Sequence, residues 1–189
     1  VGGADRPGGG MIVKAITLDF FRNYLHLEAA FHPRINVIFG DNAQGKTNLL
    51  EAFWFFTGGR SFRGSKDGET VAFGAEKASL KLEFYAAGRD QEAEISIARR
   101  RSAVLNGVPQ PAASRLAGQF CAVVFSPAHL SLIKDGPEGR RRFLDAAYCQ
   151  LRPGYVRVLT DFQRTLTQRN ALLKELRAGL GDDRLLSVW

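Results

Sequence analysis

The feature that most constrains this chain is an eight-residue loop between a short apolar run and a stretch with helical periodicity. The loop consists of Gly40, Asp41, Asn42, Ala43, Gln44, Gly45, Lys46 and Thr47, which fits the phosphate-loop pattern. Glycines let backbone N–H groups approach phosphate oxygens closely, and the helix that follows adds the positive end of its dipole. The loop therefore predicts a nucleotide site, where Lys46 bridges the β- and γ-phosphates and Thr47 places its hydroxyl on Mg²⁺.

Short alternating apolar runs predict a β-rich lobe around this loop. Strands are expected at residues 12–18, 25–31, 35–39, 79–85, 92–98 and 104–108, the last with an Asn-Gly turn. A continuous apolar run at 120–125 is typical of a strand buried on both faces. Apolar positions at helical spacing predict a helix over 46–56. Together these patterns indicate an α/β fold with a mixed sheet and an antiparallel β meander.

Prolines mark the expected starts of two C-terminal helices. Pro137 opens a helix that runs to about Leu151, and Pro153 opens one that extends to about Ala178. Apolar side chains recur along the second helix at steps of four and three, interrupted by Arg169. They are Tyr155, Leu159, Phe162, Leu166, Leu173, Leu176 and Leu180. Such a stripe suits a coiled-coil partner, and packing on the helix's own domain is equally open.

The chain is basic, with 26 Lys and Arg against 19 Asp and Glu and a net charge of +7. Residues 137–178 hold nine basic and four acidic side chains, a net charge of +5. This excess suits a nucleic-acid partner, although a solvated basic surface gives the same count. No apolar run approaches the roughly 18 residues of a membrane span. Two cysteines at no metal-ligand spacing indicate a cytoplasmic setting and no zinc site.

The residues that hydrolysis requires are harder to find than those for binding. Beyond the loop, no run of four apolar residues ends in Asp-Glu, the pattern that holds magnesium and polarises water. Asp41 and Glu51 are the carboxylates nearest the loop in sequence, and neither is placed like a general base. The sequence therefore supports nucleotide binding more strongly than turnover.

Ordered blocks along the chain resemble the RecF family of bacterial recombination mediators, SMC-like relatives of the ABC-type ATPases. One set is Phe21-Arg22-Asn23-Tyr24, residues 35–52 and Gly59-Arg60-Ser61. A second set is Phe125-Ser126-Pro127, residues 132–137 and residues 140–145. The blocks follow in order between Met11 and Trp189, and the last of them is specific to RecF.

The resemblance implies an ABC-type P-loop NTPase head, with this chain as its N-terminal lobe followed by a long arm helix. It implies ATP and Mg²⁺ at residues 40–47, with Arg22 and Asn23 as further nucleotide contacts. The DNA-binding candidates are Arg60, Arg63, Arg140, Arg141 and Arg142, the first two also as nucleotide sensors. The implied partners are duplex and gapped DNA, RecO and RecR, which help load RecA, and a second copy in an ATP-dependent homodimer.

Three regions are expected along the chain. Residues 1–10 are glycine-rich, precede Met11 and lack the apolar core of a signal peptide, so they form a flexible leader or a cloning scar. Residues 11–150 form the ATP-binding lobe, and residues 151–189 begin the arm. The family's signature motif and acidic metal-holding strand belong to its C-terminal portion, so we expect an N-terminal fragment that does not hydrolyse ATP alone.

One position departs from the family, and two other functions remain open. Ala43 stands where the family has glycine, so we expect a β or right-handed backbone there, which costs nothing. A stand-alone P-loop phosphotransferase is one alternative. The other is a DNA- or protein-binding module whose loop is a structural turn. That reading leaves Lys46 unexplained, because a positive charge in the first helical turn opposes the dipole unless an anion binds there.

Overall fold

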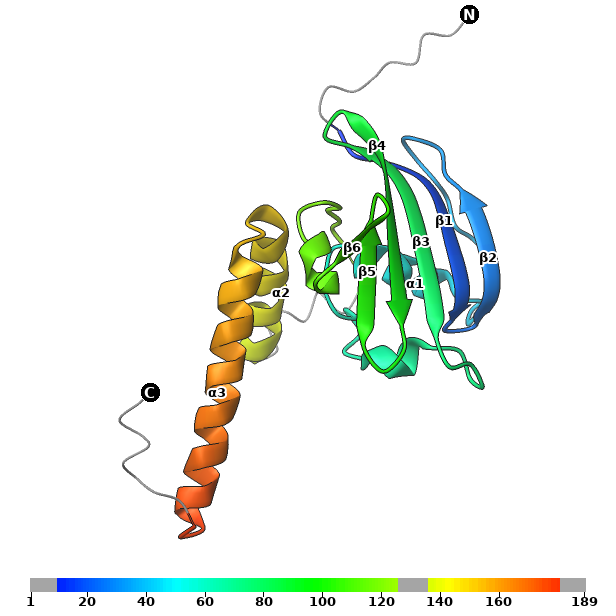
Figure 1. The fold of residues 1–189 in the computed structure, drawn as a ribbon. Helices are drawn as coiled ribbons and strands as arrows, with labels where there is room; N and C mark the ends of the chain where they lie inside the picture. The colour runs from blue at the N-terminus through cyan, green and yellow to red at the C-terminus, as the bar shows by residue number, and fades with distance from the viewer. Residues whose placement is uncertain (1–9, 126–135, 181–189) are drawn as a thin grey trace, which may run out of the picture.

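The computed structural model describes residues 10–125 and 136–180 and is built around one six-stranded sheet (Figure 1). The strands are β1 (Ile12–Phe21), β2 (Tyr24–Ala30), β3 (Ala78–Ala86), β4 (Arg89–Ile97), β5 (Arg101–Leu105) and β6 (Val108–Gln110). Their order is β2-β1-β3-β4-β5-β6, and every neighbouring pair is antiparallel. The meander predicted from the alternating runs is therefore present.

Tight turns between consecutive strands set this topology. Asn106-Gly107 joins β5 to β6 with φ angles of 51° and 76°, and Ala87-Gly88 joins β3 to β4 with 51° and 80°. Two consecutive positive φ angles match the twist of paired strands, which is why Asn-Gly is a strong hairpin signal. The β1–β2 turn places Arg22 at φ 56°. This turn becomes important below because it lies against the phosphate loop.

The core lies between one face of the sheet and helix α1 (Lys46–Phe55), which crosses behind the strands in Figure 1. Alternate side chains of β3 are fully buried, as the period of two requires for a strand with one face inward. Phe55 packs edge-to-face on Phe21, with ring centroids 5.8 Å apart. Phe120 packs in the same way on Phe84 at 5.5 Å. These contacts fix α1, and with it the end of the phosphate loop, to the sheet.

Two predicted strands are not formed, so the expected mixed sheet is antiparallel throughout the described residues. Residues 35–39 have an apolar strand pattern but make no ladder in the described part of the chain. Ile35, Val37 and Phe39 are 77%, 78% and 89% exposed. A strand forms only where a neighbouring backbone supplies the hydrogen bonds of a ladder, and the described residues supply none here. The run predicted at 120–125 forms no strand either: Phe120 makes one isolated bridge to Ala117, and Val123 and Phe125 are exposed.

Helices α2 (Pro137–Leu151) and α3 (Tyr155–Arg177) lie beside the sheet, with α3 extending past its lower end (Figure 1). The Tyr155 hydroxyl donates to Asp145 Oδ1 at 2.8 Å, which links the two helices. Their junction meets the β lobe where Gln150 Oε1 accepts from the Ala122 N–H at 2.7 Å. Several side chains of the predicted α3 stripe, such as Phe162 and Leu166, are exposed. None of the described helices is long and apolar enough to cross a membrane.

Two 3₁₀ turns, Asp67–Thr70 and Ala113–Leu116, complete the described elements. Parts of the predicted leader, of the Ser126-Pro127 and 132–137 blocks, and of the arm beyond residue 180 lie outside the described residues.

Candidate nucleotide-binding site

The N-terminus of α1 is open to an anion. Gly45 is the N-cap residue, and within the described residues no side chain caps this helix end. The first turn contains no acidic residue. The first N–H groups of a helix have no partners inside the helix, so they carry a partial positive charge that favours phosphate. This end of α1 has the polarity that the sequence pattern predicts.

The loop that leads into α1 uses three backbones in the positive-φ region. Gly40 has φ 145°, Ala43 has φ 66° and Gly45 has φ 101°. The expectation that Ala43 takes a β or right-handed backbone is therefore wrong. The loop must turn sharply at this position, and alanine adopts the left-handed conformation at a cost of about 1–2 kcal/mol. The glycine expected at this position would adopt it freely.

The Lys46 ammonium lies across the loop. Its Nζ donates to the carbonyl oxygens of Gly40 at 2.7 Å and Asp41 at 2.5 Å. Gln44 closes the same turn, because its Oε1 accepts from the Asp41 N–H at 3.2 Å. Thr47 is exposed at the start of α1. The charge and the hydroxyl that the sequence assigns to phosphate and to Mg²⁺ are thus at the mouth of the loop.

The β1–β2 turn supports the loop from the other side. Asn23 Nδ2 donates to the Gln44 carbonyl at 3.2 Å, and the Tyr24 hydroxyl donates to the Gly45 carbonyl at 3.1 Å. Burial raises the pKa of Tyr24, which keeps the phenol protonated and able to donate. Asn23, predicted as a nucleotide contact, lies here against the loop backbone.

Arg22 forms a buried ion pair with Glu51 of α1. Its Nε donates to Oε2 at 2.9 Å and its Nη2 to Oε1 at 2.8 Å. Glu51 is fully buried, and its Oε1 also accepts from the Ser61 hydroxyl. The sequence suggested Glu51 only as a poor candidate base, and its pairing was missed. The structure places Arg22 beside the loop but binds its guanidinium to this carboxylate.

The segment from Gly59 to Lys66 brings further arginines to α1, Arg63 near its start at Asn48 and Arg60 near its end at Trp54. Arg63 Nη1 donates to Asn48 Oδ1 at 2.8 Å and lies 3.8 Å from Glu51 Oε2. The Arg60 carbonyl accepts from the Trp54 indole N–H at 2.9 Å. Both predicted residues therefore lie near the phosphate-loop helix.

Arg101 ends a run of three arginines, a pattern usually found on the surface, yet its side chain is only 10% exposed. Its guanidinium packs over the Phe55 ring at 5.1 Å and donates to the Gly59 carbonyl at 2.5 Å. Burial lowers the pKa of Arg101, and the nearby charge of Asp67 opposes that change. Arg101 begins β5, so the strand turns its side chain toward α1, while Arg99 and Arg100 stay exposed. It anchors the segment that carries Arg60.

The remaining DNA-binding candidates, Arg140, Arg141 and Arg142, lie on α2, away from the loop in sequence and on a different element. All three are exposed, and Arg142 pairs with Glu138 one turn earlier at 3.9 Å. The structure thus separates the predicted site residues into a cluster around the loop and a basic run on α2.

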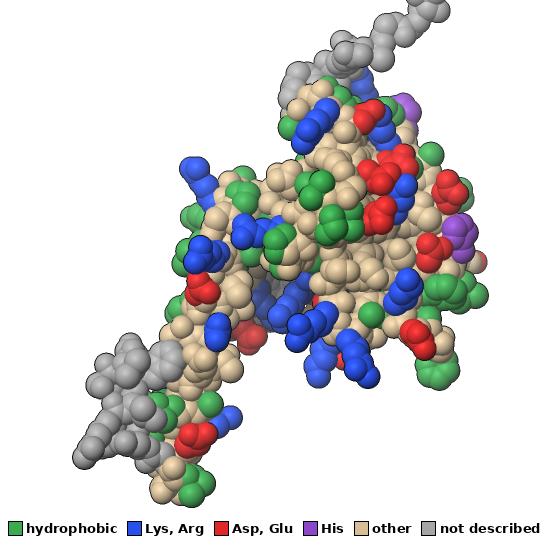
Figure 2. All heavy atoms as spheres, viewed as in Figure 1, with side chains coloured by type: hydrophobic (Ala, Val, Ile, Leu, Met, Phe, Trp, Pro, Cys, Tyr) green, Lys and Arg blue, Asp and Glu red, His purple; other side chains and the backbone are tan. Residues whose placement is uncertain are grey.

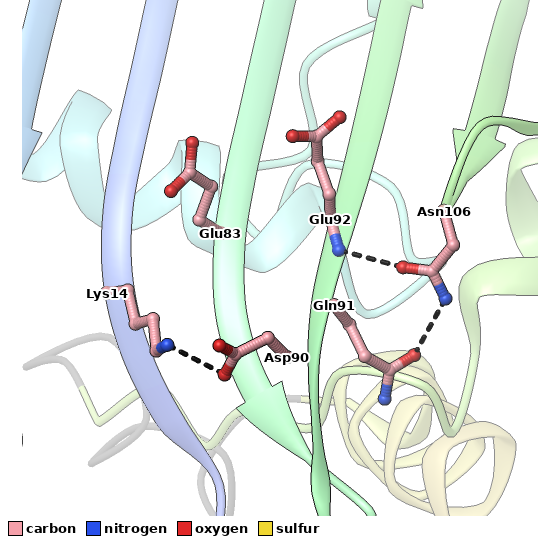
Figure 3. Close-up of a pocket in the computed structure, with 6 residues that line it drawn as sticks. All are labelled: Lys14, Glu83, Asp90, Gln91, Glu92 and Asn106. Atoms are coloured by element: carbon pink, nitrogen blue, oxygen red, sulfur yellow. Dashed lines mark hydrogen bonds and ion pairs between the residues drawn. The ribbon is translucent and has the colours of Figure 1, made fainter.

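A second hollow lies on the β lobe, between strands β1, β3 and β4 (Figure 3). Lys14 pairs with Asp90 at 2.7 Å, and Asn106 Nδ2 donates to Gln91 Oε1 at 3.3 Å. Asn106 Oδ1 accepts from the Glu92 N–H at 2.9 Å. These contacts link β1 to β4 across β3 and β4 to the β5–β6 turn, so we assign the hollow a structural role.

The residues of the loop fit ATP and Mg²⁺ by the chemistry of their groups. The loop combines an uncapped helix start, positive-φ backbones at Gly40 and Gly45, and the ammonium of Lys46. The exposed hydroxyl of Thr47 is an oxygen ligand of the kind that Mg²⁺ takes together with phosphate oxygens.

Comparisons with known proteins identify the family to which the chain is related. A family described as "AAA domain" matches residues 15–178. The DNA replication and repair protein RecF of Agathobacter rectalis is 42% identical over 185 residues, which cover 95% of this chain and 50% of that protein. The RecF of Lachnospira eligens is 38% identical over 183 residues, with the same coverage. The chain spans about half the length of the curated relatives it matches.

Solved structures show the same relationship. A structure of RecF with ATP, described as a recombination mediator protein of the RecFOR pathway, has a TM-score of 0.88 and 34% identity. It is matched over 98% of this chain and 50% of its own. A structure from work on ATP-driven dimerization of SMC ATPases has a TM-score of 0.56 over 72% of this chain, at 21% identity. These matches confirm the predicted ABC-type P-loop fold.

Proposed function

Because this chain belongs to the AAA-domain family and, within it, to the RecF proteins, we propose that it is the ATP-binding part of a recombination mediator. The observation that carries the proposal is the loop before α1, where Lys46 Nζ lies between two loop carbonyls at an uncapped helix N-terminus. Bound ATP would supply the triphosphate whose charge Lys46 and the helix dipole neutralise, and Thr47 would hold Mg²⁺.

We propose binding without turnover for these 189 residues. Glu51 is buried against Arg22 and Ser61, so its carboxylate is not free to take a proton from water. Asp41 lies at the exposed start of the loop, where its Oδ2 accepts from Gln44 Nε2 at 3.5 Å, a contact too long to fix it as a general base. This arrangement disfavours a stand-alone phosphotransferase. We expect ATP hydrolysis only with groups from the rest of the full-length protein.

Exposed apolar segments support the proposal that other residues of the full-length protein cover this surface and complete the fold. Ile35, Val37 and Phe39 are exposed apolar side chains in a segment without secondary structure, and Val123 and Phe125 are also exposed. Exposed apolar runs of this kind are typical of surfaces that another chain segment covers. We propose that residues of the full-length protein add strands beside 35–39 and a helix on the exposed side of α3.

DNA binding and partner binding belong to the same proposal. Figure 2 shows Lys and Arg side chains gathered beside the hollow between the helices and the sheet. We propose that duplex or gapped DNA contacts Arg60, Arg63 and the basic run of α2, and that the full-length protein dimerises with ATP and acts with RecO and RecR to load RecA. DNA affinity that falls steeply with salt would support this. A DNA-binding module with a structural loop predicts equal DNA affinity with and without ATP.

Calorimetry with MgATP on the wild type and on Lys46→Ala tests the nucleotide site. We expect the variant to lose measurable binding, because it removes the charge across the loop. Lys174→Ala, on exposed α3, is the matched control and should bind like the wild type. A hydrolysis assay of the same samples should show no turnover. Equal binding by wild type and Lys46→Ala would contradict the site, and Lys46-dependent hydrolysis would contradict binding without turnover.

A further inference from the structure

The turn between β1 and β2 touches the phosphate loop so closely that it leaves no room for a side chain at position 45. A Cβ added to Gly45 would lie 2.6 Å from Asn23 Oδ1 and 2.7 Å from its Nδ2. A Cβ at this position would force the Asn23 amide to shift, and the φ of 101° independently favours glycine. The Asn23 amide is therefore part of the outer wall of the loop.

The hydrogen bond from Asn23 controls the direction of a loop N–H. The Gln44 carbonyl and the Gly45 N–H belong to one planar trans peptide, so they point in opposite directions. Asn23 Nδ2 holds that carbonyl on the outer side of the loop at 3.2 Å. The Gly45 N–H is thereby aimed toward the opposite side, where a phosphate-binding loop needs its donors. A loop peptide without such a donor is free to rotate.

The Asn23 amide is itself fixed at its other end. Its Oδ1 accepts from Asn48 Nδ2 at 2.8 Å, which leaves Nδ2 for the Gln44 carbonyl. Asn48 Oδ1 in turn accepts from Arg63 Nη1 at 2.8 Å. Each amide thus has one orientation that satisfies both of its neighbours. The network runs from the Gly59–Lys66 segment through α1 to the loop backbone.

We propose that Asn23 is a positioning residue that holds the Gly45 N–H of the phosphate loop in its binding direction, and that it acts through the loop without touching the nucleotide. The inference rests on the proposed nucleotide site. It assigns Asn23 a role different from the direct nucleotide contact that the sequence suggested. It also predicts that the loop has its binding shape before the nucleotide arrives.

The test compares Asn23→Ala with the wild type in the nucleotide-free protein and in binding experiments. The first readout is the pair of ¹H–¹⁵N signals of Gly45 and Lys46 without ligand, which should move in the variant because the loop peptide is released. The second is the affinity for MgATP and for pyrophosphate, which should both fall about three- to tenfold, the effect of one lost hydrogen bond. Asn170→Ala, on exposed α3, is the matched control and should change neither.

Asn23→Asp keeps the shape of the side chain and the oxygen that faces Asn48 but removes the N–H donor to the Gln44 carbonyl. It allows the same comparison of loop signals and affinities if Asn23→Ala does not fold. Unchanged Gly45 and Lys46 signals in the ligand-free variants would overturn the proposal, as would a loss of affinity for ATP but not for pyrophosphate. If the wild type binds neither MgATP nor pyrophosphate, the proposed nucleotide site is contradicted. The Gly45 and Lys46 signals without ligand still decide whether Asn23 positions the loop.

Discussion

Removal of the Glu51 carboxylate should destabilise the protein more than removal of any surface carboxylate. Glu51 is fully buried, and its two oxygens accept from Arg22 Nε, Arg22 Nη2 and the Ser61 hydroxyl. Glu51→Ala would leave the Arg22 guanidinium, whose side chain is only 15% exposed, without its counter-charge. It would also leave Ser61 without an acceptor and open a cavity beside Phe55.

The size of the effect follows from these contacts. Loss of one partner of a buried pair costs about 3–5 kcal/mol. Arg22 keeps its hydrogen bonds to the Glu69 carbonyl at 3.0 Å and the Ser65 hydroxyl at 2.8 Å, and water reaches part of it, so we expect the lower end. Glu51→Ala should therefore reduce the free energy of unfolding by about 3 kcal/mol. Arg22→Ala should cost about as much, because it leaves the buried carboxylate with too few donors.

Urea denaturation followed by tryptophan fluorescence measures these changes by linear extrapolation. Glu138→Ala is the control, because its side chain is exposed and its pair with Arg142 spans 3.9 Å, so a change below about 0.5 kcal/mol is expected. The double variant of Arg22 and Glu51 should cost clearly less than the sum of the single variants, since the two residues share one interaction. A loss below about 1 kcal/mol for Glu51→Ala, or additive losses, would refute the reasoning.

Three further predictions concern other parts of the chain. Ala43→Gly should raise the free energy of unfolding by about 0.5 kcal/mol in a urea titration. Glycine removes the backbone strain at φ 66°, and this gain outweighs the added entropy of the unfolded chain. A lower free energy of unfolding would contradict the prediction. Gly118→Ala should lower the free energy of unfolding by about 2 kcal/mol, because φ is 79° and the new Cβ would lie 2.5 Å from Pro153 Cγ. An unchanged urea midpoint would contradict this prediction. Burial raises the pKa of both Cys121 and Cys149, so at pH 8 fewer thiolates form and Ellman's reagent should react more slowly with the folded than with the urea-unfolded chain.

The local elements of this fold follow from the sequence because their signals are local. The Asn106-Gly107 pair supplies two positive φ angles, so the hairpin it predicts is found at that place. Pro137 fixes the first turn of α2, which runs from Pro137 to Leu151 as expected. The helix after the phosphate loop is likewise found where the apolar spacing placed it. Each feature depends on residues within a few positions of one another.

Features that depend on residues far apart in the sequence could not be predicted from it. The pattern at residues 35–39 satisfies every local rule for a strand, yet a strand exists only where another backbone pairs with it. Arg101 belongs to a run of three arginines that suggests solvent, but β5 begins at this residue and turns its side chain onto Phe55. Ala43 takes a left-handed backbone because the whole loop imposes it. The sequence carried no local signal for any of these outcomes.

The Glu51 pair also limits what Arg22 can do for a nucleotide. All three guanidinium nitrogens are engaged, two of them with Glu51 and the third with the Glu69 carbonyl. If Arg22 swung onto a phosphate, the buried carboxylate would keep only Ser61 and the longer contact to Arg63 at 3.8 Å. A phosphate contact by Arg22 would therefore leave the buried Glu51 carboxylate short of donors, which disfavours that contact. The pair thus keeps Arg22 on Glu51 and leaves Arg63 on Asn48, where it supports the Asn23 amide that positions the loop.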